Sequence, residues 1–201
     1  MTILSKNDQK GRSMVEMLGV LAIIGVLSVG GISGYSKAMA KFKLTKAQDQ
    51  ISMLLMNIRT AFATSPSYEG LNNGNAVAFA IAPGDMYKGT VSQDASVSQL
   101  NNAFGGGAHV FACSEATGCK YGTGATGTAS TSNQYFAIKL TNLGREACVS
   151  LASSDWGTDG LLSIQVNGSY FGSDSLPIDM MNAGSACPKY GERGEIIWTY
   201  Y

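Results

Sequence analysis

The sequence has few of the residues from which active sites and metal sites are built. It contains one histidine, His109, and four cysteines. Charged residues make up 14% of the chain, and 14 Lys and Arg balance 14 Asp and Glu, so no nucleic acid or other polyanionic partner is indicated. No serine, cysteine or carboxylate arrangement around His109 has the form of a catalytic site. We therefore predict that the protein is not an enzyme and has no catalytic residues, no metal and no cofactor.

One stretch almost lacks polar residues. From Met14 to Ile32 the chain is apolar apart from glycine, serine and one acid, Glu16. This is about the 20 residues that a helix needs to cross a bilayer core of roughly 30 Å. A secretory signal peptide has a shorter apolar core of about 7–15 residues, followed by a cleavage site of small residues. The stretch therefore predicts a membrane-spanning helix.

Glu16 needs an explanation in this setting. A carboxylate at the bilayer centre costs on the order of 2.5–3.5 kcal/mol, and one near the end of the span costs less. Glu16 is then either an interfacial acid on an ordinary anchor or an intramembrane acid that requires a partner. Its position favours the second interpretation, because it is the fifth residue after Gly11, where the polar leader ends and the apolar run begins.

A glycine, five residues ending in glutamate and an uninterrupted apolar run resemble the processing site of type IV prepilins and pseudopilins. The resemblance implies that a prepilin peptidase cuts between Gly11 and Arg12 on the cytoplasmic side, and that the new N-terminus at Arg12 is methylated. It also implies that Glu16 meets the N-terminal amine of a neighbouring subunit during assembly, which fits the lower cost of a buried carboxylate beside a cation. Arg12 departs from the family pattern, in which the first mature residue is usually Phe, Met or Leu, and it brings a second cation close to Glu16.

The helix is expected to continue far beyond the span. We predict that it runs from Ser13 to about Ala63, because the residue before Pro66 disfavours the α conformation. Its second half is amphipathic, with an apolar stripe that we expect to dock on the C-terminal domain. The stripe consists of Ile51, Leu54, Leu55, Ile58 and Phe62.

Two glycines of the apolar half, Gly30 and Gly34, have the four-residue spacing that lets helices approach closely in membranes. Glycine is also frequent in ordinary membrane helices. We predict that these two glycines both allow close packing and make the helix easier to bend, since glycine has a low helix propensity.

Positive charges leave the orientation of the span ambiguous. Three cations precede the span and four follow it. The flank with more positive charge is usually cytoplasmic, and here the two counts are nearly equal. They are Lys6, Lys10 and Arg12 on one side and Lys37, Lys41, Lys43 and Lys46 on the other. The cysteines favour export of the C-terminal part, because disulfides form in oxidising compartments.

Four cysteines in such a chain indicate two disulfides, for which three pairings are possible. Cys113 and Cys119 suit a small local loop, which leaves Cys148 with Cys187. A bond that spans about 40 residues stabilises a fold by roughly 3–4 kcal/mol. The alternative is a zinc site, but the thiol ligands of such sites usually lie closer together in the sequence.

Beyond the long helix, the sequence pattern is hard to read between Pro66 and about Ser132 and becomes clear from Tyr135. In the first of these parts, the pattern predicts a short helix over 97–104 that Gly105 to Gly107 end, and a strand at 110–112. In the second, we predict strands over 135–140 and 161–166, a hairpin turn at Asn167-Gly168 into 169–171, and a final strand over 196–201. A helix capped by Thr141 or Asn142 is expected to contain Cys148 and to end near Ser153.

This half of the chain resembles type IVb pilins, the group of the toxin-coregulated and bundle-forming pilus subunits and of conjugative thin-pilus pilins. The likeness lies in the Phe136-Ala137-Ile138 strand, the helix with Cys148, the strand into Asn167-Gly168, and Cys187 before the last strand. It implies an α+β fold in which a long N-terminal helix packs on an antiparallel sheet with disulfides. The expected parts are a leader at 1–11, a helix at 12–64 with its membrane or filament-core segment at 12–34, and a head at 65–201.

The two resemblances together imply a structural subunit of a surface filament that serves adhesion, motility, conjugation or aggregation. The implied partners are copies of the same chain, a prepilin peptidase, an assembly ATPase and an inner-membrane platform protein. The subunit would sit in the inner membrane with a periplasmic head before assembly, and in an extracellular pilus afterwards. The alternatives are a pseudopilin of a type II secretion system and a single-pass anchored periplasmic binding protein.

Other polar residues give weaker signals. Residues 155–160 resemble an acidic calcium loop but lack the full ligand spacing, so we expect a solvated turn. His109 is expected to be structural. Four acids near the C-terminus are expected either to contact other subunits or to face water: Asp174, Asp179, Glu192 and Glu195.

Overall fold

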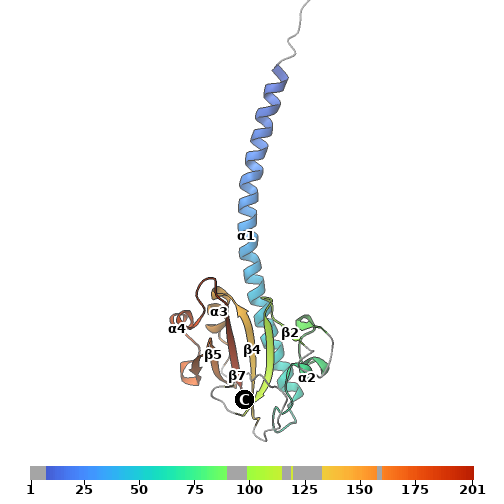
Figure 1. Cartoon of the computed structure of the whole chain (residues 1–201), viewed down its shortest axis with the longest axis vertical. Helices are drawn as coiled ribbons and strands as arrows, with labels where there is room; N and C mark the ends of the chain where they lie inside the picture. Colours follow the sequence, from blue (N-terminus) through green and yellow to red (C-terminus); the bar gives the residue numbers. More distant parts are fainter. Residues whose placement is uncertain (1–7, 90–98, 115–118, 120–132, 158–159) are drawn as a thin grey trace, which may run out of the picture. The chain divides into compact units, whose positions relative to one another are not determined.

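The computed structural model describes residues 8–89, 99–114, 119, 133–157 and 160–201, with side chains described from residue 14 onward. The chain divides into two compact units, Met1–Phe42 and Lys43–Tyr201. One helix, α1 (Asp8–Ala61), contributes to both (Figure 1). It begins five residues before the expected start at Ser13 and ends two residues before the expected end.

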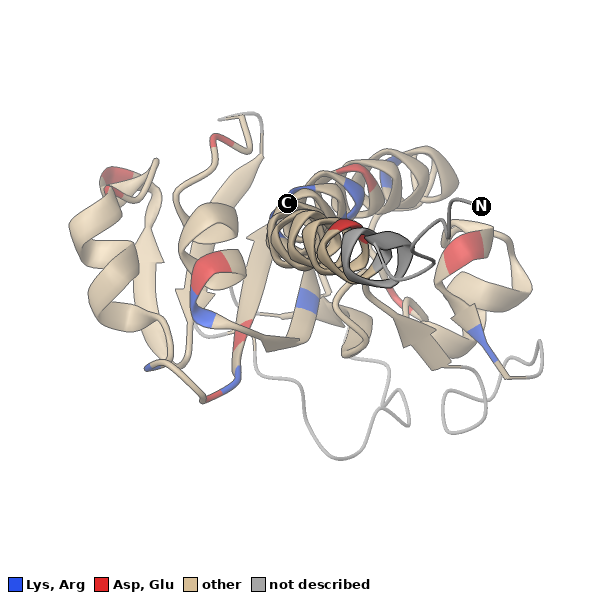
Figure 2. Ribbon diagram, turned by 90° about the horizontal axis from the view of Figure 1, so that it is seen from above, with Lys and Arg blue, Asp and Glu red and all other residues tan. Residues whose placement is uncertain are grey.

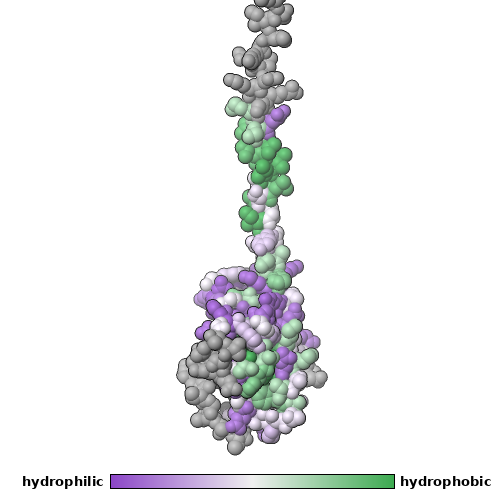
Figure 3. Space-filling model, turned by 90° about the vertical axis from the view of Figure 1, so that its right-hand side faces the viewer, coloured by the Kyte–Doolittle hydropathy of each residue, from purple (hydrophilic) through white to green (hydrophobic). Residues whose placement is uncertain are grey.

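The described part of the first unit consists of α1 alone. From Met14 to Ala38 every side chain is exposed, and the surface is mostly apolar (Figure 3). Within the described residues, α1 is the one helix whose length and composition would allow it to cross a membrane. An apolar helix that is exposed all round requires lipid or other protein around it.

The second unit is built on an antiparallel sheet of seven strands in the order β1-β2-β3-β4-β7-β5-β6. The strands are β1 (Tyr87–Lys88), β2 (Gln99–Asn101), β3 (Gly107–Cys113), β4 (Tyr135–Leu143), β5 (Leu161–Val166), β6 (Ser169–Gly172) and β7 (Gly194–Tyr200). The last strand therefore lies inside the sheet, between β4 and β5. Short helices complete the unit: α2 (Asn73–Ala78), α3 (Arg145–Ala152), α4 (Met180–Ala186) and two 3-10 turns, η1 (Gly84–Met86) and η2 (Ser173–Ser175).

The core lies between the C-terminal part of α1 and one face of this sheet. Ile51, Leu54 and Ile58 are fully buried, as is Ala47 one turn earlier. They belong to one cluster with the inward residues of β4 and β7, which include Phe136, Ile138, Leu140, Ile196, Trp198 and Tyr200. Complete burial of a side chain of this size contributes about 1.5–3 kcal/mol. The predicted stripe is confirmed, with Leu55 and Phe62 at its half-buried margins.

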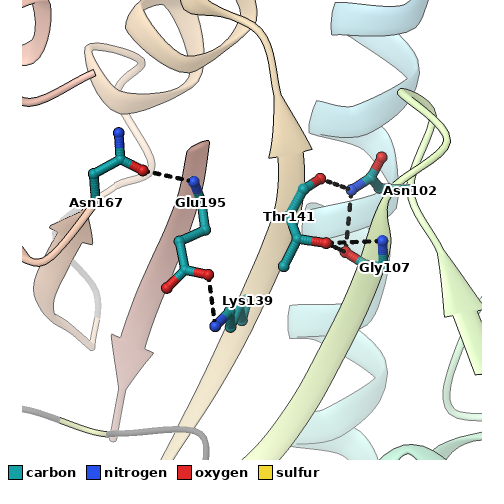
Figure 4. A network of polar contacts seen from close by, with 6 residues as sticks. All are labelled: Asn102, Gly107, Lys139, Thr141, Asn167 and Glu195. Atoms are coloured by element: carbon teal, nitrogen blue, oxygen red, sulfur yellow. Dashed lines mark hydrogen bonds and ion pairs between the residues drawn. The ribbon is translucent and has the colours of Figure 1, made fainter. Parts of the chain in front are cut away.

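The helix expected over 97–104 is wrong. Residues 99–101 form β2, and residues 97 and 98 lie outside the described residues. Asn102 then makes the turn with its side chain. Its Oδ1 accepts hydrogen bonds from the backbone N–H groups of Phe104 and Gly106, and its Nδ2 donates to the carbonyls of Gly107 and Thr141 (Figure 4). A short apolar run does not distinguish a strand from a helix, and an asparagine that bonds its own backbone favours a turn.

The expected cap of α3 is also wrong. Thr141 and Asn142 belong to β4, where the Thr141 hydroxyl bonds both backbone groups of Gly107. Asn142 has a left-handed φ of 62° at the point where the pairing of β4 with β7 shifts register. Gly144 precedes α3 and provides no side-chain cap.

The Asn167-Gly168 hairpin is confirmed. Both residues have positive φ, 47° and 86°, as a type I′ turn requires. The Asn167 side chain does more than form the turn. Its Oδ1 accepts from the N–H of Glu195 at the start of β7, and its Nδ2 donates to the carbonyl of Ala186 at the end of α4. Asn167 thus links the β5–β6 hairpin to β7 and to α4.

Candidate assembly and processing site

Glu16 lies on the exposed apolar part of α1. Its side chain is exposed, and its neighbours Met14 and Met17 are 69% and 63% exposed. Going toward the C-terminus along α1, the next charged residue is Lys37. Arg12 lies four residues before Glu16, which places both on the same helix face one turn apart. If lipid or apolar protein surrounds this part of α1, a cation that pairs with Glu16 must come either from the N-terminal end of the same helix or from a neighbouring molecule.

The Gly11–Arg12 bond lies within α1, because the helix begins at Asp8. The predicted leader at 1–11 and the helix therefore overlap, whereas the sequence suggested that the helix begins after the predicted cleavage point. Only one turn precedes this bond, and terminal helical turns open at almost no cost in free energy. The bond can accordingly become accessible without disruption of the rest of α1.

Gly30 and Gly34 leave open surface on α1. A Cβ atom built on either residue would meet no atom within 4 Å. The helix is unbroken here, and Ser28 and Ser36 donate hydrogen bonds to the carbonyls of Ile24 and Ile32 one turn earlier. Contacts within the chain therefore do not require glycine at these two positions, and the predicted close packing and flexibility stay predictions.

The edge of the head at α3 and α4 is fastened by a disulfide and by an arginine. Cys148 of α3 is bonded to Cys187, which follows α4, with 5.8 Å between the Cα atoms. One turn earlier on α3, the Arg145 guanidinium donates to the carbonyls of Gly184 and Pro188. These carbonyls lie at the C-terminal end of α4, where a cation is favourable. The second disulfide joins Cys113 at the end of β3 to Cys119.

Helix α4 was not predicted from the sequence. Its start is nevertheless marked by Asp179, whose Oδ1 accepts hydrogen bonds from the N–H groups of Met181 and Asn182. These bonds hold the pKa of Asp179 below its usual value. An aspartate in this position is a recognisable helix start, but the helix is short and has no clear apolar period.

The other acids have separate roles. Glu195 forms an ion pair of 2.7 Å with Lys139 across β7 and β4 (Figure 4), and Glu192 accepts a hydrogen bond from the Lys189 N–H. Asp174 is exposed beside Ser173. In the described part of the head, acidic and basic residues are interspersed along the chain (Figure 2). The structure therefore does not bring these acids together into one site.

The suggested calcium loop is a turn in its described part. Asp155 accepts a hydrogen bond from the Gly157 N–H, and residues 158 and 159 lie outside the described residues. Within the residues that the structure covers, no three His, Cys, Asp or Glu residues come together as possible metal ligands.

His109 is a half-buried residue of β3. Its Nδ1 lies 3.5 Å from Nδ2 of Asn73, an amide that also bridges α2 to the β3 backbone. Burial lowers the pKa of His109, the charge of Lys139 lowers it further, and Glu195 acts in the opposite direction. His109 is accordingly neutral in the folded head at neutral pH.

This pKa shift predicts acid sensitivity. An unfolded histidine, with a pKa of about 6.5, binds a proton more readily than the folded His109 does. Stability should therefore fall as the pH drops below about 6.5, and less so in a His109→Gln variant. Denaturant midpoints of both proteins at neutral and mildly acidic pH measure this. Equal losses in the two proteins would show that His109 does not cause the sensitivity.

Comparison with known proteins identifies the family. The family model described as Bundlin matches residues 37–200, which is most of the chain. The chain belongs to the Bundlin family. The chain is thus a type IVb-like pilin, and the expected α+β pilin fold is confirmed. The match begins at residue 37, so it does not include the predicted leader or the segment that contains Glu16.

Individual relatives agree with the family. The chain is 25% identical over 210 aligned residues to the "Major structural subunit of bundle-forming pilus" of Escherichia coli O111:H-, covering 99% of this chain and 97% of that protein. It is 27% identical to the "Toxin coregulated pilin" of Vibrio cholerae serotype O1, covering 74% of this chain and 59% of that one. The crystal structure of a type IV b pilin from Salmonella typhi shares the fold, with a TM-score of 0.55 and 21% identity over 80% of this chain and 98% of that chain.

Proposed function

We propose that this protein is a structural subunit of a surface filament, processed after Gly11 and assembled through α1. The observation that carries the proposal is the alignment, over nearly the full length of both chains, with a protein named as a major pilus subunit. The exposed apolar helix with its single acid supports the same role. A type II secretion pseudopilin and a simple anchored binding protein are less favoured, because the relatives are named as pilus subunits.

The mechanism is physical rather than chemical. Before assembly, the apolar half of α1 spans the inner membrane, and the head lies in the periplasm, where its disulfides form. During assembly, the helices of neighbouring subunits replace the lipid around Met14 to Gly34. Gly30 and Gly34 permit close approach, because no side chain separates the helices at these points.

Glu16 sets the register of neighbouring subunits. Transfer of a carboxylate into an apolar helix bundle is unfavourable unless a cation accompanies it. Cleavage after Gly11 creates an amine at Arg12, which lies at the same end of the helix as Glu16. A neighbour is therefore favoured in the position that brings its amine to Glu16. Arg12 of the same chain is one turn away and competes for the carboxylate, so the two cations share it.

Further partners follow from the pilin class. A prepilin peptidase would make the cut and methylate Arg12, and an assembly ATPase with an inner-membrane platform protein would drive extraction from the membrane. The mature subunit would then be exposed on an extracellular pilus.

Processing can be tested by mass. The exported protein should have the intact mass of a chain that begins at Arg12, with both disulfides closed and with one methyl group on the N-terminus. A Gly11→Ala precursor should be cut more slowly, because the side chain obstructs the junction, and a Gly25→Ala precursor is the matched control within the same helix. Mature protein that retains residues 1–11 would contradict the proposal.

A further inference from the structure

Two lysines follow the apolar part of α1 in the first unit. Lys37 and Lys41 are both exposed, and their spacing of four residues places them on one helix face about 6 Å apart. The sequence of α1 contains no acid between Glu16 and Asp49, so neither lysine has an anionic partner one turn away on its own helix. In the proposed orientation these cations lie on the periplasmic side. The usual excess of Lys and Arg in membrane proteins is on the cytoplasmic side, so it does not explain them.

Their distance from the membrane follows from helix geometry. Residues from Met14 to Gly34 form a helical segment of roughly 31 Å, which matches the bilayer core of about 30 Å. Tyr35 comes next and is 67% exposed, and tyrosine is enriched at the boundary between hydrocarbon and headgroups. The Cα atoms of Lys37 and Lys41 then lie about 4 Å and 10 Å beyond the core.

The direction of the side chains brings both ammonium groups back toward the lipid. In an α-helix the Cα–Cβ bonds tilt toward the N-terminus, which here is the membrane side. Lysine also extends its ammonium group along the helix to reach polar groups at the interface. The helix is regular in this region, since Ser36 Oγ donates to the Ile32 carbonyl at 3.0 Å without a break in α1. Both charges can therefore reach the headgroup layer, which is about 5–7 Å deep on each side.

We propose that Lys37 and Lys41 form a binding site for the phosphate group of anionic phospholipids in the periplasmic leaflet. Tyr35 fixes the depth of the helix, and the two ammonium groups hold one phosphodiester between them. The proposal rests on the membrane-inserted precursor of the proposed function. Each lysine near an anionic surface increases binding roughly fivefold, so the pair holds the precursor at one depth until assembly removes it.

The test uses the full chain in vesicles of phosphatidylcholine, with or without phosphatidylglycerol. Resistance to alkaline extraction first establishes insertion in both lipids. A water-soluble amine-acylating reagent then measures the reactivity of each lysine by mass spectrometry. Lys37 and Lys41 should react about threefold or more slowly when phosphatidylglycerol is present, and salt should reduce this protection. Lys88 and Lys189, both exposed in the head, should be unaffected.

A second readout does not depend on reactivity. Particles extracted from mixed vesicles with an amphipathic copolymer should retain phosphatidylglycerol above its bulk fraction. The Lys37→Gln, Lys41→Gln double variant should lose this enrichment, and the Lys88→Gln, Lys189→Gln double variant should keep it.

The remaining outcomes separate the possible anions. Inorganic phosphate added to phosphatidylcholine vesicles should give no protection, and protection by phosphate alone would overturn the assignment to lipid. Equal reactivity and equal lipid composition in all arms would overturn the site itself, while insertion and processing could still be correct. Failure of the chain to insert would overturn the membrane-anchored precursor and the lipid site together.

Discussion

Replacement of Glu16 by alanine should abolish surface filaments or reduce them by at least about tenfold, while the chain remains inserted in the membrane. The apolar helix becomes more apolar, so insertion is not weakened. What is lost is the attraction between the carboxylate and the amine at Arg12 of a neighbour. An interaction of only about 1.4 kcal/mol at each subunit contact changes the association constant tenfold, and a filament repeats that contact along its whole length.

Three measurements separate assembly from its alternatives. Electron microscopy of sheared surface material counts filaments, alkaline extraction of membranes measures insertion, and intact mass measures processing. Glu146→Ala provides the matched control, because Glu146 is an exposed acid on α3. Filaments of normal number and length from the Glu16→Ala chain would remove Glu16 from the mechanism.

Loss of the Cys148–Cys187 disulfide should destabilise the head strongly, and by more than loss of the Cys113–Cys119 disulfide. The bond closes a separation of 39 residues, for which the loop-entropy model gives about 4 kcal/mol. The Cys148→Ala, Cys187→Ala chain should therefore unfold at a much lower denaturant concentration. The released segment is α4, which would keep the hydrogen bonds from Arg145 and the Asp179 cap.

The second disulfide is the natural control for this experiment. The Cys113–Cys119 separation is six residues, so the same model gives only about 2 kcal/mol for the Cys113→Ala, Cys119→Ala chain. Unfolding of the full chain in detergent can be followed by tryptophan fluorescence, because the rings of Trp156 and Trp198 lie 5.2 Å apart within the head. A larger loss from the short loop than from the long one would contradict the chain-entropy explanation.

Much of the head could be predicted where the sequence pattern has one physical solution. The stripe at Ile51, Leu54 and Ile58 repeats at helical spacing, and only one face of a helix can satisfy it. Asn167-Gly168 predicts its hairpin because both residues tolerate positive φ. The strand ending in Tyr200 is apolar or aromatic from Ile196 apart from Thr199, and the sheet buries it between two neighbours.

The wrong predictions concern segments whose sequence is compatible with two different local structures. Gln99 to Asn101 fit either a short helix or a strand, and pairing with β1 and β3 selected the strand. Thr141 and Asn142 have side chains that can cap a helix N-terminus. However, β4 extends through them, because Thr141 forms a hydrogen bond with Gly107 on the neighbouring strand. Gly107 lies 34 residues from Thr141, and the β1 partner Tyr87 lies 13 residues from Leu100, so a reading of short sequence windows does not identify these contacts.

The sequence by itself determined the membrane-length helix, its single acid, the docking stripe and the resemblance to pilins, because each depends on residues that are near one another along one helix or turn. Only the tertiary structure decided the strand order, the central place of β7, and the way Asn167 and Arg145 fasten α4. The bonds of Asn167 and Arg145 join residues that are 19 to 43 positions apart, and β4 pairs with β7 over separations of 51 to 64 residues. The free energy of such contacts exists only once the chain has closed the loops between them.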